Sequence, residues 1–140
     1  MLPVRQDIET ETVFAEGELR VLAARLDADD DAVAAMTAWL SPEELERGRR
    51  CHFERDRRRF AVARALLRRL LGERLGAPPA AVALAAGANG KPMLRGTQAK
   101  SGWQFNVSRC GDLALFAFSP RCRVGVDVEA AREVRGADII

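Results

Sequence analysis

Two carboxylates stand two residues apart near the end of the chain, within the segment Gly125-Val126-Asp127-Val128-Glu129. Alternate side chains of a β-strand point to opposite faces, so Asp127 and Glu129 would share one face. Their Cα atoms would lie roughly 6.6 Å apart, because each residue advances the strand by about 3.3 Å. Carboxylates held this close repel each other unless a cation lies between them, and oxygen ligands suit Mg²⁺. The pattern also leaves open an edge strand with a solvated acidic face.

Basic residues are concentrated in one segment of a nearly neutral protein. The net charge is +2, but residues 41–74 contain eleven arginines against six acids, whereas residues 1–40 contain nine acids against three arginines. A local excess of arginine favours a local anionic ligand over a surface built for nucleic acid. The sequence also has no tyrosine and lacks the interleaved aromatics of a stacking surface. We therefore expect no nucleic-acid partner, and an arginine-rich nucleic-acid-binding module stands only as an alternative.

The composition is typical of one globular domain. Apolar residues make up 48% and charged residues 30% of 140 residues, enough for one core but not for two. No apolar run could span a bilayer, and the N-terminus lacks the pattern of a signal peptide, so we expect a cytoplasmic protein without a membrane partner. Three cysteines without a Cys-x-x-Cys pair indicate reduced thiols. The single histidine, His52, has no partner at zinc-ligand spacing.

Helical signals occupy the first half of the chain. Residues 1–18 are polar and acidic without clear periodicity, so we expect a loosely ordered lead-in. Three aspartates at 29–31 predict a helix that runs to Leu40. The sequence Ser41-Pro42-Glu43-Glu44 predicts the start of the next helix, with a Ser cap, Pro at the first position and Glu at the third. A longer helix is predicted over Asp56–Leu75, where apolar residues recur at three- and four-residue steps.

Strand signals follow the helices. A short strand is predicted at 21–26, ahead of the helices, and the segments after Gly76 are β-branched or aromatic and bounded by Gly, Pro or Ser. Turn signals stand at Asn89-Gly90 and Gly111-Asp112. Helices first and strands after predict an α+β domain, with helices packed on a mostly antiparallel sheet. The strands predicted after Gly76 are 82–86, 104–108, 113–119 and 123–129.

Five patterns now stand in a fixed order. They are Ser41-Pro42-Glu43 at a helix start, an arginine cluster that extends through Arg59, Gly90-Lys91-Pro92, Asn106-Val107-Ser108, and the segment from Gly125 to Glu129. This order and spacing resemble the N-terminal half of the larger, surfactin-synthetase-activating class of 4′-phosphopantetheinyl transferases. The similarity covers nearly two-thirds of the chain, from about Trp39. Gly-Lys-Pro alone is common, so the ordered set carries the resemblance.

The resemblance implies an enzyme that moves the phosphopantetheinyl arm of coenzyme A onto a serine of an apo acyl or peptidyl carrier protein. Such a reaction attacks a phosphorus atom of a diphosphate, so the site must neutralise charge that develops on phosphate oxygens. In the family, the residues that match Asp127 and Glu129 hold Mg²⁺ against the diphosphate. These two residues are therefore the catalytic and metal-binding residues that we expect.

The resemblance also implies a set of coenzyme-binding residues. Arg47 and Arg59 match basic positions that bind the 3′-phosphate and adenylate, and the planar fork of arginine pairs two phosphate oxygens at once. Lys91, beside Pro92, matches the turn that reaches the nucleotide end of coenzyme A, and Ser108 matches a serine that contacts the diphosphate. The residue after that serine is usually histidine in the family. Here it is Arg109, which keeps a positive charge but cannot exchange a proton near neutral pH.

Members of this family consist of two similar halves related by a pseudo-twofold axis, and the resemblance covers only the first. Residues 19–129 would form the N-terminal subdomain, and 130–140 would begin the connection to a second half. The Trp-x-x-Lys-Glu-Ala segment of that half, with a third acidic metal ligand, is absent from the sequence. Two hypotheses follow: an active transferase whose missing half comes from another chain, and a coenzyme-binding fragment incompetent alone. An uncovered apolar face would favour self-association.

Overall fold

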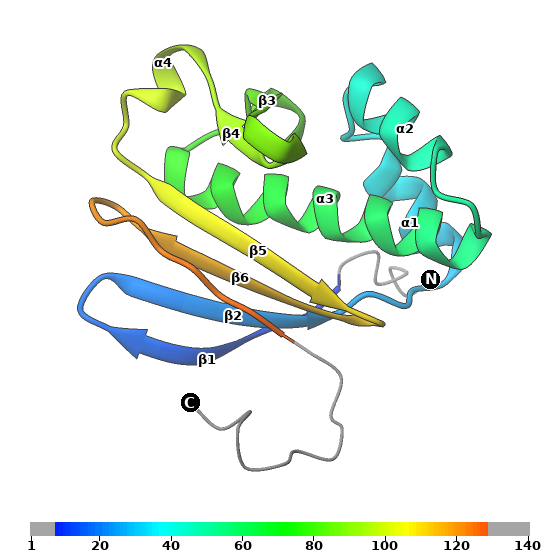
Figure 1. The fold of residues 1–140 in the computed structure, drawn as a ribbon, viewed down its shortest axis with the longest axis horizontal. Coiled ribbons are helices and arrows are strands. Elements are labelled where there is room, and N and C mark those ends of the chain that lie inside the picture. Colours follow the sequence, from blue (N-terminus) through cyan, green and yellow to red (C-terminus); the bar gives the residue numbers. More distant parts are fainter. Residues whose placement is uncertain (1–7, 129–140) are drawn as a thin grey trace, which may run out of the picture.

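A four-stranded antiparallel sheet forms the centre of the computed structural model, which describes residues 8–128 (Figure 1). The turn Gly111-Asp112 joins two neighbouring strands, and Cys110 pairs with Leu113 across it, as the predicted hairpin requires. In spatial order the strands are β1 (Thr10–Glu16), β2 (Leu19–Arg25), β6 (Leu113–Ser119) and β5 (Gln104–Cys110). The predicted fold class, α+β with helices on an antiparallel sheet, is confirmed.

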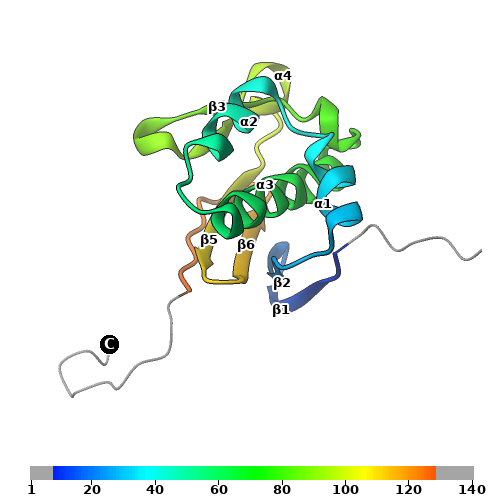
Figure 2. The ribbon, with the colours of Figure 1, turned by 90° about the vertical axis from the view of Figure 1, so that its right-hand side faces the viewer.

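One long helix, α3 (Glu54–Leu75), crosses one face of the sheet. Its apolar side chains form the predicted stripe, which gives the helix a face to bury. Two shorter helices, α1 (Asp30–Thr37) and α2 (Pro42–Arg49), pack against it, and α4 (Gly96–Ala99) follows later. Figure 2 shows all four helices on the same side of the sheet. None of the helices in the described part combines the length and apolar character that crossing a bilayer requires.

The core lies between α3 and the sheet. Side chains from the two layers meet there and are almost completely removed from solvent. Each leucine or phenylalanine buried in this way contributes about 1.5–3 kcal/mol relative to an exposed one. This interface therefore fixes α3, and every side chain on it, relative to the strands. Its most buried large members are Val62, Leu66, Leu67, Leu70 and Leu71 on α3, Met36 on α1, Leu26 directly after β2, and Phe116 and Phe118 on β6.

The start of α2 has the capping geometry that the sequence predicts. Ser41 Oγ accepts a hydrogen bond from the backbone N–H of Glu44 at 3.2 Å. The backbone N–H of Ser41 donates in return to Glu44 Oε1 at 2.8 Å. Such a reciprocal capping box satisfies two N–H groups that a helix start leaves unpaired, and Pro42 at the first position needs no partner. The angle at which α2 leaves the preceding loop is fixed in this way.

A second, two-stranded sheet lies beside the helices. Strands β3 (Leu84–Ala86) and β4 (Pro92–Leu94) pair antiparallel, and the predicted turn at Asn89-Gly90 connects them. The connection is a single 3₁₀ turn, η2 (Ala88–Gly90), and a similar turn, η1 (Pro79–Ala81), precedes β3. This small sheet presents the Gly-Lys-Pro segment toward α2 and α3.

Two predictions at the ends of the domain are wrong for the residues that the structure describes. Residues 10–16, expected to be loosely ordered, form β1, which pairs with β2 across a bulge between Thr12 and Phe14. The strand β1 lies at the edge of the sheet, and its side chains are almost all exposed. Its sequence therefore has no apolar periodicity, and the strand is held by backbone hydrogen bonds to β2. Residues 123–128, expected to be a strand, have no regular secondary structure.

The segment 123–128 is nevertheless held against the edge strand β5. Asn106 Oδ1 accepts the backbone N–H of Val126 at 3.1 Å, and Ser108 Oγ accepts that of Val128 at 3.0 Å. Side chains thus take the place of a backbone ladder, which explains why no strand forms. Alternate residues of the segment still point to opposite sides, as predicted: Val126 and Val128 are half-buried, and Asp127 between them is exposed. Glu129 and residues 130–140 lie outside the described residues.

Candidate functional site

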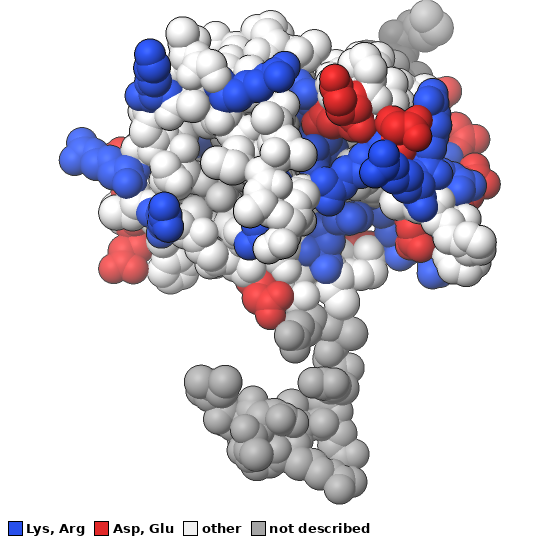
Figure 3. Space-filling view, turned by 45° about the horizontal axis from the view of Figure 1, so that its top comes forward, with Lys and Arg blue, Asp and Glu red and all other residues white. Residues whose placement is uncertain are grey.

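A cationic pocket of about 290 Å³ lies where α2, α3, β5 and the turn between β3 and β4 meet. Figure 3 shows Lys and Arg side chains gathered on this part of the surface, with a few acidic side chains among them. Among the described residues that line the pocket, four are cations and none is acidic, which favours an anionic ligand. Four of the predicted site residues lie in its wall: Arg47, Lys91, Pro92 and Arg109.

The ring of Phe60 is the common contact of three arginines in this pocket. The guanidinium carbon of Arg64 lies 5.3 Å from the ring centroid, that of Arg109 5.8 Å, and that of Arg47 6.0 Å. A cation over an aromatic face gains about 0.5–2 kcal/mol, depending on how far the pair is desolvated. Phe60 is only 6% exposed. The ring therefore forms an apolar floor that offsets part of the repulsion between like charges.

Arg47 is fixed by the turn that carries Lys91. Its guanidinium donates to the carbonyl oxygen of Gly90 at 2.5 Å. Gly90 has a φ of 75°, and a Cβ atom there would lie 3.0 Å from Nη1 of Arg47. The left-handed backbone favours glycine at this position, and an added Cβ atom would also press on the guanidinium of Arg47. The Gly-Lys-Pro turn thus positions two cations of the pocket, Lys91 within the turn and Arg47 through the carbonyl oxygen of Gly90.

Arg109 reaches the pocket because of the alternation along β5. Val107 and Arg109 line the pocket on the side of α3, whereas Ser108 faces the segment 123–128. Arg109 is exposed as a whole residue, but partial desolvation of its guanidinium lowers the pKa, and the nearby charge of Arg47 lowers it further. Arginine nevertheless remains protonated at any ordinary pH. The position therefore supplies a permanent cation.

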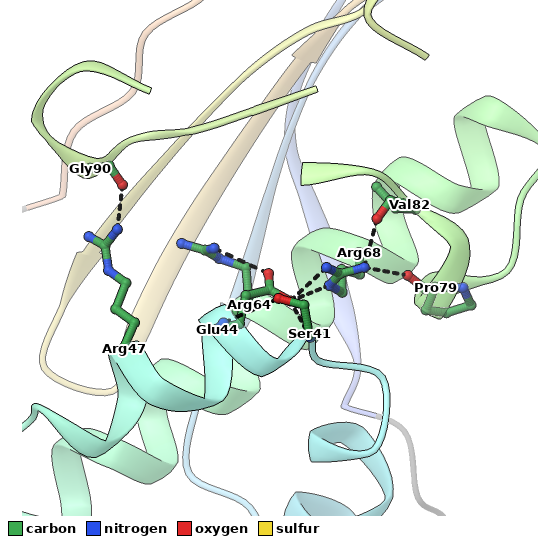
Figure 4. A network of polar contacts seen from close by, with 8 residues as sticks. All are labelled: Ser41, Glu44, Arg47, Arg64, Arg68, Pro79, Val82 and Gly90. Carbon is green, nitrogen blue, oxygen red and sulfur yellow. Dashed lines mark hydrogen bonds and ion pairs between the residues drawn. The ribbon is translucent and has the colours of Figure 1, made fainter. Parts of the chain in front are cut away.

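A buried carboxylate stands behind the pocket, between α2 and α3 (Figure 4). Glu44 is 5% exposed and Arg68 is 3% exposed. Glu44 Oε1 accepts from Arg68 Nε at 2.7 Å, and Oε2 accepts from Arg64 Nη1 at 3.2 Å. Arg68 also donates to the carbonyl oxygens of Pro79 and Val82, so it ties the turn before β3 to α3.

The hydrogen bonds to Glu44 outweigh the cost of its burial. Burial alone raises the pKa of this carboxyl, but the bonds from Arg68, from the backbone of Ser41 and from Arg64 hold the pKa below its ordinary value. The carboxylate is therefore charged at neutral pH. Both arginines keep a buried counter-ion as a result.

Ser108 and Asp127 form a second part of the site, on the other side of β5. Ser108 Oγ lies 3.3 Å from Asp127 Oδ1, to which it donates, while it accepts the N–H of Val128. The Asp127 carboxylate is exposed. Oxygen atoms of a carboxylate and a hydroxyl are ligands that suit Mg²⁺, so the donor set fits this ion. Within residues 8–128 no group of three or more His, Cys, Asp or Glu side chains could hold a metal.

Arg59 lies apart from the pocket. Its Nε and Nη2 atoms donate to the two carboxylate oxygens of Asp27 at 2.8 and 3.1 Å. This bidentate pair raises the pKa of Arg59 and lowers that of Asp27. The ligand role expected for Arg59 stays a prediction, and in the structure its guanidinium pairs with Asp27.

Sequence reasoning missed Arg64, Phe60 and Glu44 as site residues. Phe60, Arg64 and Arg68 follow one another at steps of four on α3, which places them on one face of the helix. That spacing, read together with the matched Arg47, could have placed Arg64 beside the pocket. Arg68 does not lie on a solvated face of the helix, because it is buried against Glu44.

Fold and site together define an α+β domain with a cationic pocket on one side of β5 and an exposed carboxylate on the other. The family model described as "4'-phosphopantetheinyl transferase, N-terminal" matches residues 27–121. The chain is 36% identical to the 4'-phosphopantetheinyl transferase HetI of Nostoc sp. over 115 residues, which cover 82% of this chain and 48% of HetI. It therefore belongs to the 4′-phosphopantetheinyl transferase family and corresponds to the N-terminal part of its members.

Two further relatives are more distant. A phosphopantetheinyl transferase of Thraustochytrium sp. is 34% identical over 107 residues, covering 76% of this chain and 37% of the relative. The human L-aminoadipate-semialdehyde dehydrogenase-phosphopantetheinyl transferase is 34% identical over 91 residues, which cover 64% of this chain and 29% of that protein. The chain thus spans about half, or less, of the length of the curated relatives that it matches.

Proposed function

We propose that this chain is the coenzyme-A-binding part of a 4′-phosphopantetheinyl transferase. The complete enzyme transfers the phosphopantetheinyl arm of coenzyme A to a serine hydroxyl of an apo acyl or peptidyl carrier protein. The observation that carries the proposal is the gathering of Arg47, Lys91 and Arg109 around one pocket in a member of this family. The surfactin-synthetase-activating class, suggested by the order of the motifs, is part of the proposal.

The pocket has the chemistry that a phosphorylated coenzyme requires. Guanidinium groups pair phosphate oxygens in a planar, two-pronged geometry, and such charge-assisted bonds are about twice as strong as neutral ones. The floor formed by Phe60 and Leu67 excludes water from one side and so strengthens those bonds. Arg47, Arg109 and Lys91, with the adjacent Pro92, are the proposed coenzyme ligands, and Ser108 is proposed to lie near the diphosphate.

Magnesium is the proposed metal, with Asp127 and Glu129 as its ligands from this chain. When bound, Mg²⁺ would neutralise charge on the diphosphate oxygens. Asp127 accepts a hydrogen bond from Ser108, whose hydroxyl in turn accepts the backbone N–H of Val128 at the edge of the sheet. The nucleophile is the serine of the carrier protein, so the chain need not provide one.

All three cysteines are free thiols, which supports a cytoplasmic location.

The length of the relatives supports a second candidate function. Because the matched residues cover 48% of HetI, a complete site would also need the part of the family that these residues do not match. Without it, the protein would bind coenzyme A and transfer nothing. We therefore propose a coenzyme-binding fragment as the function of this chain alone.

Two measurements test these proposals. Isothermal titration with coenzyme A should show binding, and pantetheine, which lacks the phosphates, should bind far more weakly; no binding of coenzyme A would contradict the proposed function. A transfer assay with coenzyme A, Mg²⁺ and a permissive apo carrier protein is read by intact mass. We expect an unmodified carrier, while a full-length enzyme modifies the same carrier in parallel. A modified carrier would instead establish an active transferase.

A further inference from the structure

The two oxygens of the Glu44 carboxylate are shared unequally between its partners. Oε1 accepts hydrogen bonds from Nε of Arg68 at 2.7 Å and from the backbone N–H of Ser41 at 2.8 Å, and Nη2 of Arg68 forms an ion pair with it at 2.6 Å. Among the described residues that bond to it, Oε2 has one partner, Arg64, at 3.2 Å. The carboxylate is therefore fixed by Arg68 and Ser41 whether or not Arg64 is present. Arg64 is the more weakly bound of the two arginines.

The free side of Arg64 faces the cationic pocket. A guanidinium group carries five N–H donors, and Glu44 takes one of them. Arg64 lines the pocket together with Arg47 and Arg109, and the three share the ring of Phe60. Figure 4 shows its guanidinium extending from Glu44 toward the side on which Arg47 meets Gly90. Its remaining donors are thus available on the ligand side.

We propose that Arg64 is a third anion-binding arginine of the coenzyme pocket, and that Glu44 is the positioning residue that holds it there. This inference rests on the proposed function, because it assumes that the pocket takes a phosphate group of coenzyme A. Glu44 acts through Arg64 and touches no ligand itself.

Burial makes this arginine a stronger ligand than a surface arginine. The side chain of Arg64 is 12% exposed, and burial lowers its pKa below the ordinary value while Glu44 raises it. A partly desolvated cation gains more from a phosphate than a hydrated one, because less water screens the pair. Its rotamer is already restrained by Glu44 and Phe60, so less conformational entropy is lost on binding.

The first test compares coenzyme A binding to Arg64→Gln, Arg64→Lys and Arg95→Gln by isothermal titration at two salt concentrations. Arg95 is an exposed arginine that does not line this pocket and serves as the matched control. We expect Arg64→Gln to weaken binding by about 10- to 100-fold, the usual effect of losing a hydrogen bond to a charged group. Arg64→Gln should also make coenzyme A affinity less dependent on salt concentration. Arg64→Lys should recover part of the affinity and part of its salt dependence.

Equal affinities of Arg64→Gln and Arg95→Gln would overturn the proposal. That outcome differs from a failure of the proposed function, in which the unmodified chain does not bind coenzyme A at all. Weaker binding by Arg64→Gln with an unchanged salt dependence, and no recovery in Arg64→Lys, would also overturn it. Such a result would mark Arg64 as a purely structural residue.

A double-mutant cycle tests the role of Glu44. If Glu44 acts through Arg64, Glu44→Gln changes coenzyme A affinity in the unmodified chain and leaves it unchanged in the Arg64→Gln background. Equal changes in both backgrounds would refute the positioning role. Glu43→Gln, an exposed neighbour on the same helix, controls for the loss of one negative charge. Circular dichroism verifies folding, and Glu44→Asp replaces Glu44→Gln in the cycle if the latter does not fold.

Discussion

The Ser108 hydroxyl donates to Oδ1 of Asp127 at 3.3 Å and accepts the backbone N–H of Val128 at 3.0 Å. Two residues earlier on β5, Asn106 accepts the backbone N–H of Val126 at 3.1 Å. These bonds hold alternate residues of the segment against the sheet edge, and the exposed carboxylate lies between them. The serine that the family resemblance assigns to the diphosphate therefore also orients the carboxylate assigned to the metal.

We predict that Asp127→Ala abolishes the Mg²⁺-dependent part of coenzyme A affinity. The reason is that this carboxylate is the only described ligand that we assign to the metal, and Mg²⁺ requires oxygen donors. Titrations of coenzyme A with and without Mg²⁺ measure the effect. Asp112→Ala, which removes an acid at the β5–β6 hairpin turn that pairs with Arg25, is the matched control. An unchanged Mg²⁺ dependence in Asp127→Ala would remove the residue from the metal site.

The Gly90→Ala variant should lose both stability and coenzyme A affinity. The left-handed φ of 75° alone costs about 1 kcal/mol or more in a residue with a Cβ atom. The added methyl would also lie 3.0 Å from Nη1 of Arg47, so the guanidinium would have to shift by a few tenths of an ångström and its hydrogen bond to Gly90 would be disturbed. Gly111→Ala separates the two effects, because Gly111 has a φ of 59° and open space around its Cβ position.

Thermal unfolding and titration with coenzyme A measure these two losses. We expect both alanine variants to unfold at a lower temperature and only Gly90→Ala to bind coenzyme A more weakly. Equal affinities for the two variants would mean that the contact between Arg47 and Gly90 does not support the pocket.

The sequence predicts most of the secondary structure because the deciding interactions are local. The capping box at Ser41 lies within four residues, and the apolar stripe of α3 repeats along one helix. The β5–β6 hairpin needs only a two-residue turn between two apolar runs. The strand β1 could not be predicted in the same way, since its pairing with β2 depends on backbone hydrogen bonds and its side chains are exposed.

The pocket was predictable only in part. Arg47, Lys91 and Arg109 came from motif positions, and the fold brings them together. Arg59, which came from the same comparison, pairs with Asp27, a contact between residues 32 positions apart that no local pattern reveals. The carboxylate of Glu44 was expected to serve only as a helix cap. Its burial depends on α2 lying against α3, which is a tertiary contact.

Arg109→Ala should weaken coenzyme A binding, and Arg109→His should make it dependent on pH. Histidine ordinarily has a pKa near 6.5, so the imidazole carries its charge at about pH 5.5 and has lost most of it at about pH 8. Arginine stays charged throughout, and the ratio of the His variant's affinity to the unmodified chain's affinity should therefore fall as pH rises. Titrations at several pH values measure this ratio. A constant ratio, or unchanged affinity in the Ala variant, would place Arg109 outside the binding site.

Glu44→Gln should destabilise the protein by about 3 kcal/mol at neutral pH, because it leaves two largely buried arginines without their counter-ion. The pKa of Glu44 lies below its ordinary value of 4.5 in the folded protein. The charged Glu44 carboxylate therefore contributes its full stabilisation above the ordinary pKa of 4.5. That stabilisation is lost as the pH falls through the lower pKa of the folded protein. Urea unfolding across this range should show the difference from the unmodified chain shrinking toward acid pH. The control Glu43→Gln should have the same free energy of unfolding as the unmodified chain at every pH. If Glu44→Gln remained less stable than the unmodified chain in acid, packing and not charge would account for its loss of stability.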